Sequence, residues 1–439
     1  MPRFPSSLLM SAFLPDAARR SAASSFSAAL LASLLCALVL AGCGGATGDL
    51  GNVIGLDQGE APTGTGIFRD SNVSGLDYVS GDIEGVTTSP DLEGDVGGVF
   101  EFEIGEPVTF SIGGVTLGTA GLGNPFLTPV DLLPNANTGR RDVQNMVRFL
   151  MMLDRNNDPL DGIEISDAVR AVAQNWEQIN FGALDFDELM VPIMSDVAGA
   201  DNRVPELSTE LEAKAHIDNT LRCSYSGAFG GTFSDPNAVI GSVGFTVDSR
   251  NGLLSGYVYR SATETYSRLN GINPLRFDGQ NISTVSLTGR SVPDLDDFTV
   301  QFTTLNQING NWDSDVTNQA GTLTGGRIDP IQSPAFRFVA RYEGDDTGVI
   351  SFGINRSPSD GALSNVSGEL YSLLDGAVTF SGRLIGLTGA RTLIADAQAI
   401  SFLGELDFES MTVSGTWEGT TPERTTITGT FEGTGCQLN

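Results

Sequence analysis

The chain has 439 residues, with 54 acidic residues against 24 Lys and Arg, and a formal net charge of -30. A surface of this charge repels nucleic acid and anionic lipid, which excludes binding to either through a basic patch. The 54 glycines and an aromatic fraction of 8% indicate turn-rich β structure, and the length allows two or three domains. We expect a mainly β protein with a central helical segment.

Residues 1–43 have the form of an export signal. Three arginines precede an apolar run at 27–41 that is too short for a permanent membrane helix. The run ends at Leu40-Ala41-Gly42-Cys43, which resembles the lipobox of bacterial lipoproteins. The resemblance implies that Cys43 is acylated and becomes the new N-terminus. Loss of the leader removes three positive charges and one negative, so the mature chain carries about -32.

The acyl chains on Cys43 would anchor the protein to a lipid bilayer, because each buried CH₂ contributes about 0.8 kcal/mol. Gly44 stands where, by resemblance to enterobacterial sorting, an Asp would retain the protein in the inner membrane. We therefore expect the outer membrane, on its periplasmic or cell-surface face. The alternative is an ordinary signal peptide with a chance cysteine. Residues 44–66 show no lasting periodicity and predict a flexible tether.

Two cysteines remain for the folded body, since Cys36 leaves with the leader and Cys43 carries lipid. Compartments beyond the inner membrane are oxidising, so Cys223 and Cys436 are expected to form a disulfide bond. The alternative is a pair of buried free thiols.

A small β module is predicted at 67–120. Four short segments alternate apolar and polar residues between Gly, Asp and Pro, as half-buried strands do. These segments lie at 73–79, 98–104, 108–112 and 115–117. The runs 94–102 and 109–113 resemble carboxypeptidase-regulatory-like β-sandwich modules and modules of adhesin-like lipoproteins of Gram-negative bacteria. That resemblance implies a stalk or binding module and carries no catalytic residue.

A helical region with an acidic loop is predicted at 121–221. Apolar residues at spacings of three and four indicate helices at 142–153 and from the cap Ser166 to Ile179, and a third helix is expected at about 205–221. We interpret His216, the single histidine of the chain, as a polar surface residue.

The acidic loop between the first two helices carries a calcium hypothesis. Asp154, Asn156 and Asp158 stand at positions 1, 3 and 5, as in EF-hand-like and dockerin-like loops, and Asp161 and Glu164 add oxygens. Pro159 replaces the turn glycine, and the last position is Ile165 rather than Glu. The alternative is a turn in which Asp and Asn side chains cap backbone amides, followed by a short strand.

Residues 222–439 contain an internal repeat of about 105 residues. Segment 241–247 resembles 348–354, segment 308–312 resembles 413–417, and 322–325 resembles 426–429. The strands are short, with turns such as Arg250-Asn251-Gly252, and their edges must be hidden in a barrel or a sandwich. We expect closure to bring the first strand, with Cys223, beside the last, with Cys436. An outer-membrane barrel is disfavoured, because Gly, Ser and Thr are too frequent for a lipid-facing band.

No catalytic motif is evident. One histidine excludes multi-histidine metal centres, and an oxidised cysteine pair supplies no thiol nucleophile. The expected function is therefore non-catalytic: an anchored lipoprotein that presents β domains for adhesion or protein interaction. Alternatives are a carrier of a small apolar ligand inside a barrel and a carboxylate-dependent glycan hydrolase. If Phe245, Phe352, Trp312 and Trp417 fill the interior, the barrel is structural; if it is hollow, the protein is a carrier.

Overall fold

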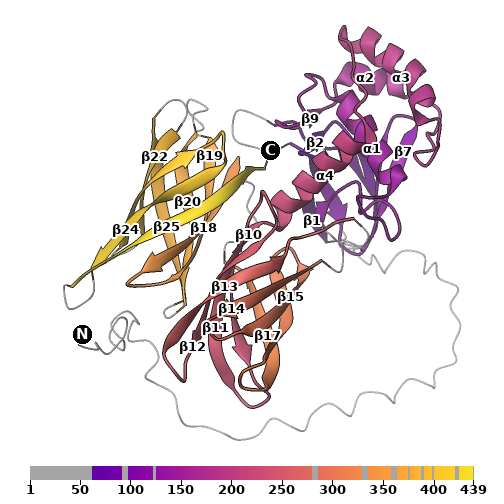
Figure 1. The fold of residues 1–439 in the computed structure, drawn as a ribbon. Coiled ribbons are helices and arrows are strands. Elements are labelled where there is room, and N and C mark those ends of the chain that lie inside the picture. The colour runs from indigo at the N-terminus through magenta and orange to yellow at the C-terminus, as the bar shows by residue number, and fades with distance from the viewer. Residues whose placement is uncertain are drawn as a thin grey trace, which may run out of the picture. The chain divides into compact units, whose positions relative to one another are not determined.

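The fold is that of a computed structural model, which describes residues 62–90, 97–121, 125–278, 285–328, 335–356, 363–373, 376–386, 390–397, 400–420 and 425–438. It is mainly β, with an N-terminal β module, a helical segment and two closed barrels (Figure 1). No helix within these ranges is both long and apolar enough to cross a membrane. Cys43 and residues 94–96 lie outside the described residues.

The N-terminal module contains three small sheets. Its strands are β1 (Thr63–Phe68), β2 (Val73–Ser74), β3 (Asp77–Ser80), β4 (Ile83–Val86), β5 (Val99–Glu103), β6 (Val108–Ile112), β7 (Val115–Ala120), β8 (Phe126–Leu127) and β9 (Ile163–Glu164). They pair in the orders β4-β3-β6-β7, β5-β1-β8 and β2-β9. Phe68, Phe100 and Phe110 form its buried aromatic centre. β1 begins inside the stretch predicted as tether, where Gly64 and Gly66 leave room for the rings of Phe102 and Phe100 on β5.

Four helices follow the β module within the described residues: α1 (Arg141–Leu153), α2 (Asp167–Ala173), α3 (Phe186–Asp201) and α4 (Glu210–Tyr225). Ser166 caps α2 as predicted, but the helix ends at Ala173 rather than continuing to Ile179. The carbonyl of Ala173 instead accepts a hydrogen bond from Gly114 in the β6–β7 turn. Helix α3, which contains Pro192, was not predicted from the sequence.

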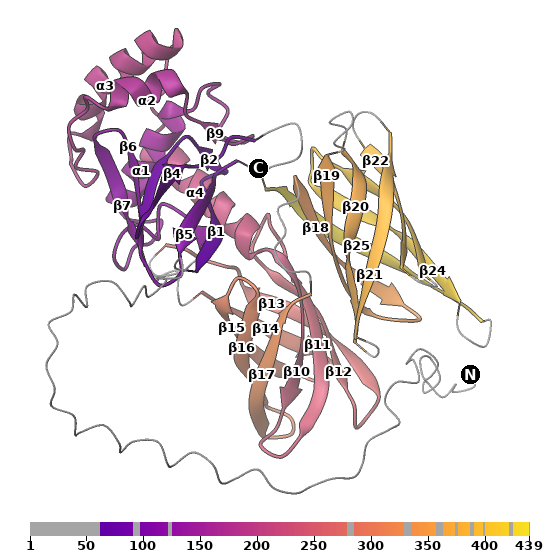
Figure 2. The same ribbon diagram turned by 180° about the vertical axis from the view of Figure 1, so that it is seen from behind.

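The first barrel comprises β10–β17 and the second β18–β25 (Figures 1 and 2). The first is built from β10 (Gly227–Ser234), β11 (Val239–Val247), β12 (Leu254–Arg260), β13 (Thr265–Asn273), β14 (Ser286–Val292), β15 (Asp296–Thr304), β16 (Gln307–Ser314) and β17 (Gln319–Arg327). The second is built from β18 (Phe336–Gly344), β19 (Gly348–Arg356), β20 (Leu363–Ser372), β21 (Gly376–Ile385), β22 (Ala390–Ala397), β23 (Ile400–Asp407), β24 (Thr412–Thr420) and β25 (Thr426–Gln437). Each repeat copy thus closes on itself.

The predicted disulfide bond joins Cys223 to Cys436, but it does not close a barrel. Cys223 lies in α4, and Cys436 lies in β25 of the second barrel. Barrel closure occurs within each copy, where β10 pairs with β17 and β18 with β25. The expectation of a first strand paired with a last strand was therefore wrong, because eight strands suffice to hide all edges of one copy.

Both barrel interiors are filled by side chains. Phe245, Phe352, Trp312 and Trp417 are each at most 2% exposed and belong to the two barrel cores. By the criterion set from the sequence, these filled interiors are those of structural barrels.

Pairing registers refine the repeat alignment. Trp312 faces Gly321 in the first barrel, and Trp417 faces Gly429 in the second, so Gly321 and Gly429 are equivalent. The predicted match of 322–325 with 426–429 is displaced from this equivalence by four residues. Strands that alternate Gly and Thr with a period of two specify their register weakly, which explains the error.

Candidate functional site

The two barrels pack directly against each other through a small apolar cluster and Tyr371. Tyr371 of β20 packs with the buried cluster of Ala228, Ile328, Val339 and Val349. A Cβ at Gly230 of β10 would lie 2.8 Å from Tyr371 ring atoms, so only glycine admits the ring there. Polar contacts reinforce the interface.

These polar contacts join side chains of the first barrel to the second. Ser242 Oγ donates to the Leu373 carbonyl at 2.7 Å, and Ser249 Oγ donates to the Gly435 carbonyl at 2.6 Å. Ser255 Oγ accepts a hydrogen bond from Arg341 at 2.6 Å. The interface therefore contains both close packing and directed hydrogen bonds.

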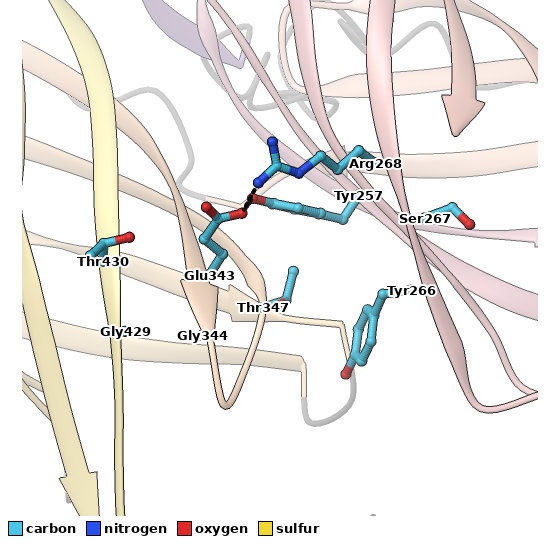
Figure 3. A pocket seen from close by; sticks show the side chains of 9 residues that line it. All are labelled: Tyr257, Tyr266, Ser267, Arg268, Glu343, Gly344, Thr347, Gly429 and Thr430. Atoms are coloured by element: carbon cyan, nitrogen blue, oxygen red, sulfur yellow. Dashed lines mark hydrogen bonds and ion pairs between the residues drawn. The ribbon is translucent and has the colours of Figure 1, made fainter. Parts of the chain in front are cut away.

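Beside this contact lies an open groove of about 590 Å³, which we call the inter-barrel groove. Among the described residues, nine line the groove; three of them are Ser267 and two glycines, and none has an aliphatic side chain. The six other side chains are Tyr257, Tyr266 and Arg268 from the first barrel and Glu343, Thr347 and Thr430 from the second (Figure 3).

Glu343 is the centre of the polar cluster in the groove. Its Oε2 accepts a hydrogen bond from Tyr257 Oη at 2.9 Å and lies 2.6 Å from Arg268 Nη2. Figure 3 shows Tyr257 and Arg268 converging on this carboxylate, with Tyr266 apart from them. The hydrogen bond from Tyr257 and the charge of Arg268 hold the pKa of Glu343 below its usual range. Burial and the bond to Glu343 raise the pKa of Tyr257, so the phenol remains a donor.

Strand pairing explains how residues distant in sequence meet here. Tyr257 and Arg268 are direct cross-strand partners on β12 and β13. Glu343 is placed at the end of β18 by Trp417, whose Nε1 donates to the Glu343 carbonyl at 3.2 Å. The core of the second barrel thus positions one side of the groove.

The groove cluster has no counterpart at the equivalent positions of the repeat. The registers place Glu369, Ala377 and Thr379 where the first barrel has Tyr257, Tyr266 and Arg268. They also place Ser234 at the position of Glu343, and Trp312 Nε1 donates to the Ser234 carbonyl at 3.0 Å. The barrel fold therefore does not require the groove residues. These residues were not predicted from the sequence, although a comparison of the two copies shows that they differ from their counterparts.

His216 was expected at the surface, but it is only 9% exposed. Its Nε2 lies 3.1 Å from Oδ1 of the fully buried Asp70 and 3.5 Å from Ser71 Oγ. Burial lowers the pKa of His216, but the charge of Asp70 and hydrogen bonds to it outweigh this effect, so the pKa is raised. Ser71 and Asp70 approach the same ring nitrogen, unlike the nucleophile and the orienting acid of a catalytic relay. This contact instead fixes α4 to the β1–β2 loop.

The acidic loop forms a network of hydrogen bonds around Asp154. Its two carboxylate oxygens accept from the amides of Glu164 at 3.0 Å and Asp158 at 2.8 Å. Asn156 Oδ1 also accepts a hydrogen bond from the Asp158 amide, and Asn156 Nδ2 donates one to the Asp161 carboxylate. These are the contacts of the turn interpretation. Among the described residues, no group of three or more His, Cys, Asp or Glu is arranged to hold a metal; calcium binding by this loop stays a prediction.

Comparisons with known proteins give no family. A scan against family models finds no match, and a search of curated proteins finds none either. Among solved structures, the vaccine antigen transferrin-binding protein B from Haemophilus parasuis is similar at 10% identity with a TM-score of 0.17. That match covers 48% of this chain and 63% of the other, so the chain spans less than two thirds of the other chain's length.

A second match is a protein of unknown function of the DUF3598 family from Nostoc punctiforme. It has 11% identity and a TM-score of 0.15, and it covers 48% of this chain and 96% of that chain. Similarity at this level establishes neither a relationship nor a function.

Proposed function

We propose that this chain is a lipid-anchored, non-catalytic binding protein of the outer membrane, and that the inter-barrel groove is its binding site. One observation carries the proposal: the barrel interiors are packed, whereas Tyr257, Tyr266, Arg268 and Glu343 gather in a groove outside them. Tyr and Arg are the side chains most enriched at energetically important binding positions. Folding of a single barrel does not require them, because the repeat has other residues at the equivalent positions.

The anchor rests on the lipobox resemblance at Cys43. Substitution Cys43→Ala removes the thiol that would be acylated, so we expect the protein to move from the membrane fraction to the soluble fraction. Protease treatment of intact cells then shows on which face of the outer membrane the protein lies. Degradation of the wild-type protein supports adhesion at the cell surface, and full protection supports a periplasmic role.

The binding site is tested with the mature chain carrying Cys43→Ala. Immobilised protein is incubated with solubilised cell-envelope and extracellular fractions, and the material retained is compared between variants. Arg268→Thr introduces the residue of the equivalent repeat position and should abolish retention. Arg290→Thr is the matched control, because Arg290 is also an exposed, ion-paired arginine of the first barrel and does not line the groove. Equal retention by both variants would contradict the proposed site.

A further inference from the structure

We propose that the inter-barrel groove binds a neutral saccharide. This inference rests on the proposed binding function and specifies the chemistry of the partner.

The polar groups of the groove match sugar hydroxyls, each of which can donate and accept a hydrogen bond. The Arg268 side chain is 58% exposed and the Glu343 side chain 44% exposed, so both reach solvent while they are paired. A guanidinium beside a carboxylate offers donors and acceptors to neighbouring hydroxyls of one sugar ring. Tyr257 and Arg268 both donate to Oε2 of Glu343, and Figure 3 shows the other carboxylate oxygen turned away from them. The hydroxyls of Thr347 and Thr430 line the same space.

Tyr266 supplies an apolar face in the same groove, apart from the Glu343 cluster. It is 36% exposed, and its ring lies 5.0 Å from that of Tyr259, measured between centroids. A ring supported in this way presents a fixed, amphipathic surface at little entropic cost. The C–H face of a pyranose can pack on such a ring while its hydroxyls meet the polar cluster.

Other classes of ligand fit the groove less well. Glu343 and Arg268 compensate each other, and a chain with a net charge of -30 repels polyanions. Both barrels are closed, so the strands that border the groove have no open edge with which a peptide strand could pair. An apolar ligand or an amphipathic helix needs aliphatic contacts, and the lining has none. The volume of about 590 Å³ suits a short oligosaccharide.

Affinity electrophoresis of the Cys43→Ala mature chain tests the inference. Native gels contain one soluble neutral polysaccharide each: dextran, mixed-linkage β-glucan, mannan, galactan or arabinoxylan. We expect at least one to retard the protein. Arg268→Thr and Tyr266→Ala should each raise the apparent Kd at least about tenfold. The controls Arg290→Thr and Ile272→Ala, the latter exposed on the same strand as Tyr266, should migrate as wild type.

The outcomes separate this inference from the proposed function. Retardation that depends on Arg268 and Tyr266 supports both. If no polysaccharide retards the protein, the saccharide inference is wrong, and the proposed groove still stands if Arg268→Thr abolishes retention of a cell-envelope protein. If neither form of binding responds to Arg268→Thr, both are wrong.

Discussion

The two barrels have similar interiors but different outer surfaces. Phe229 stacks on Phe245 with ring centroids 5.4 Å apart, and Phe338 stacks on Phe352 at 5.6 Å. Each barrel also has one tryptophan whose indole donates to a backbone carbonyl at the end of its first strand. The polar cluster around Glu343 has no equivalent at the repeat-related positions. Shared features therefore report what one barrel needs to fold, and unshared features serve either the barrel–barrel contact or the function.

The largest expected effect is loss of a core tryptophan. Trp312→Ala and Trp417→Ala should each lower the free energy of unfolding by about 3–5 kcal/mol, because each leaves a cavity in a packed barrel. Denaturant unfolding measures both. If one substitution costs less than about 1 kcal/mol, the interior of that barrel is not packed as described.

Milder substitutions at the same positions distinguish fold from function. Trp312→Phe and Trp417→Phe should cost similar stability through the lost indole donor, about 1–3 kcal/mol. Only Trp417→Phe should weaken binding in the groove, because Trp417 holds the Glu343 carbonyl. Equal loss of binding in both variants would mean that the effect is a general one on stability.

Two equivalent tyrosines have different surroundings. Tyr371 lies in the barrel–barrel contact over Gly230, whereas Tyr259, its repeat counterpart, packs beside Tyr266. Tyr371→Ala should lower the free energy of unfolding by about 2 kcal/mol, and Tyr259→Ala by about 0.5 kcal/mol or less. Thermal and urea unfolding of both variants check this order. A larger cost at Tyr259 would contradict the assigned interface.

Outside the barrels, His216 should have a smaller, pH-dependent effect on the free energy of unfolding. Its raised pKa means that the contact with Asp70 stabilises the folded state fully below the unfolded pKa of about 6.5. That contribution is lost as pH rises through the folded pKa. The free energy of unfolding should therefore fall as pH increases past this range, and His216→Asn should flatten the curve. Parallel curves for both proteins would show that His216 contributes no proton linkage.

The acidic loop should not respond to calcium. If its oxygens serve backbone amides, the melting temperature stays constant from micromolar to millimolar calcium, and Asp154→Ala costs about 1–2 kcal/mol through the lost caps. The calcium hypothesis instead requires a rise in melting temperature that Asp154→Ala with Asp158→Ala abolishes. Calorimetric scans with and without calcium decide between the two interpretations.

Local patterns in the sequence predicted local structure well. Alternation indicated β5, β6 and β7, three-and-four spacing indicated α1, and Ser166 indicated the start of α2. The single strand predicted at 73–79 was wrong, because β2 and β3 are separate strands that belong to different sheets. The capping box of Thr209 and Glu212, which begins α4, was also readable but was overlooked. The length of α2 was not readable, because it depends on a hydrogen bond between Ala173 and a distant turn.

The candidate site depended on information that a single pass along the chain does not contain. The repeat predicted two copies, yet whether they form one barrel or two depends on which strands pair. Tyr257 and Glu343 are 86 residues apart and meet only because two barrels pack together. His216 is likewise buried by contacts with the β1–β2 loop, where Ser71 lies 145 residues earlier in the chain.

The most direct test of the account replaces the groove residues by their repeat equivalents. Tyr257→Glu, Tyr266→Ala, Arg268→Thr and Glu343→Ser are combined in the Cys43→Ala mature chain, and partner affinity is measured beside the melting temperature. Because the same fold already carries these residues at the equivalent positions, we expect the melting temperature to fall by only a few degrees and the affinity to drop by about a hundredfold or more. Unchanged affinity in the folded variant would contradict the claim that binding resides in the inter-barrel groove.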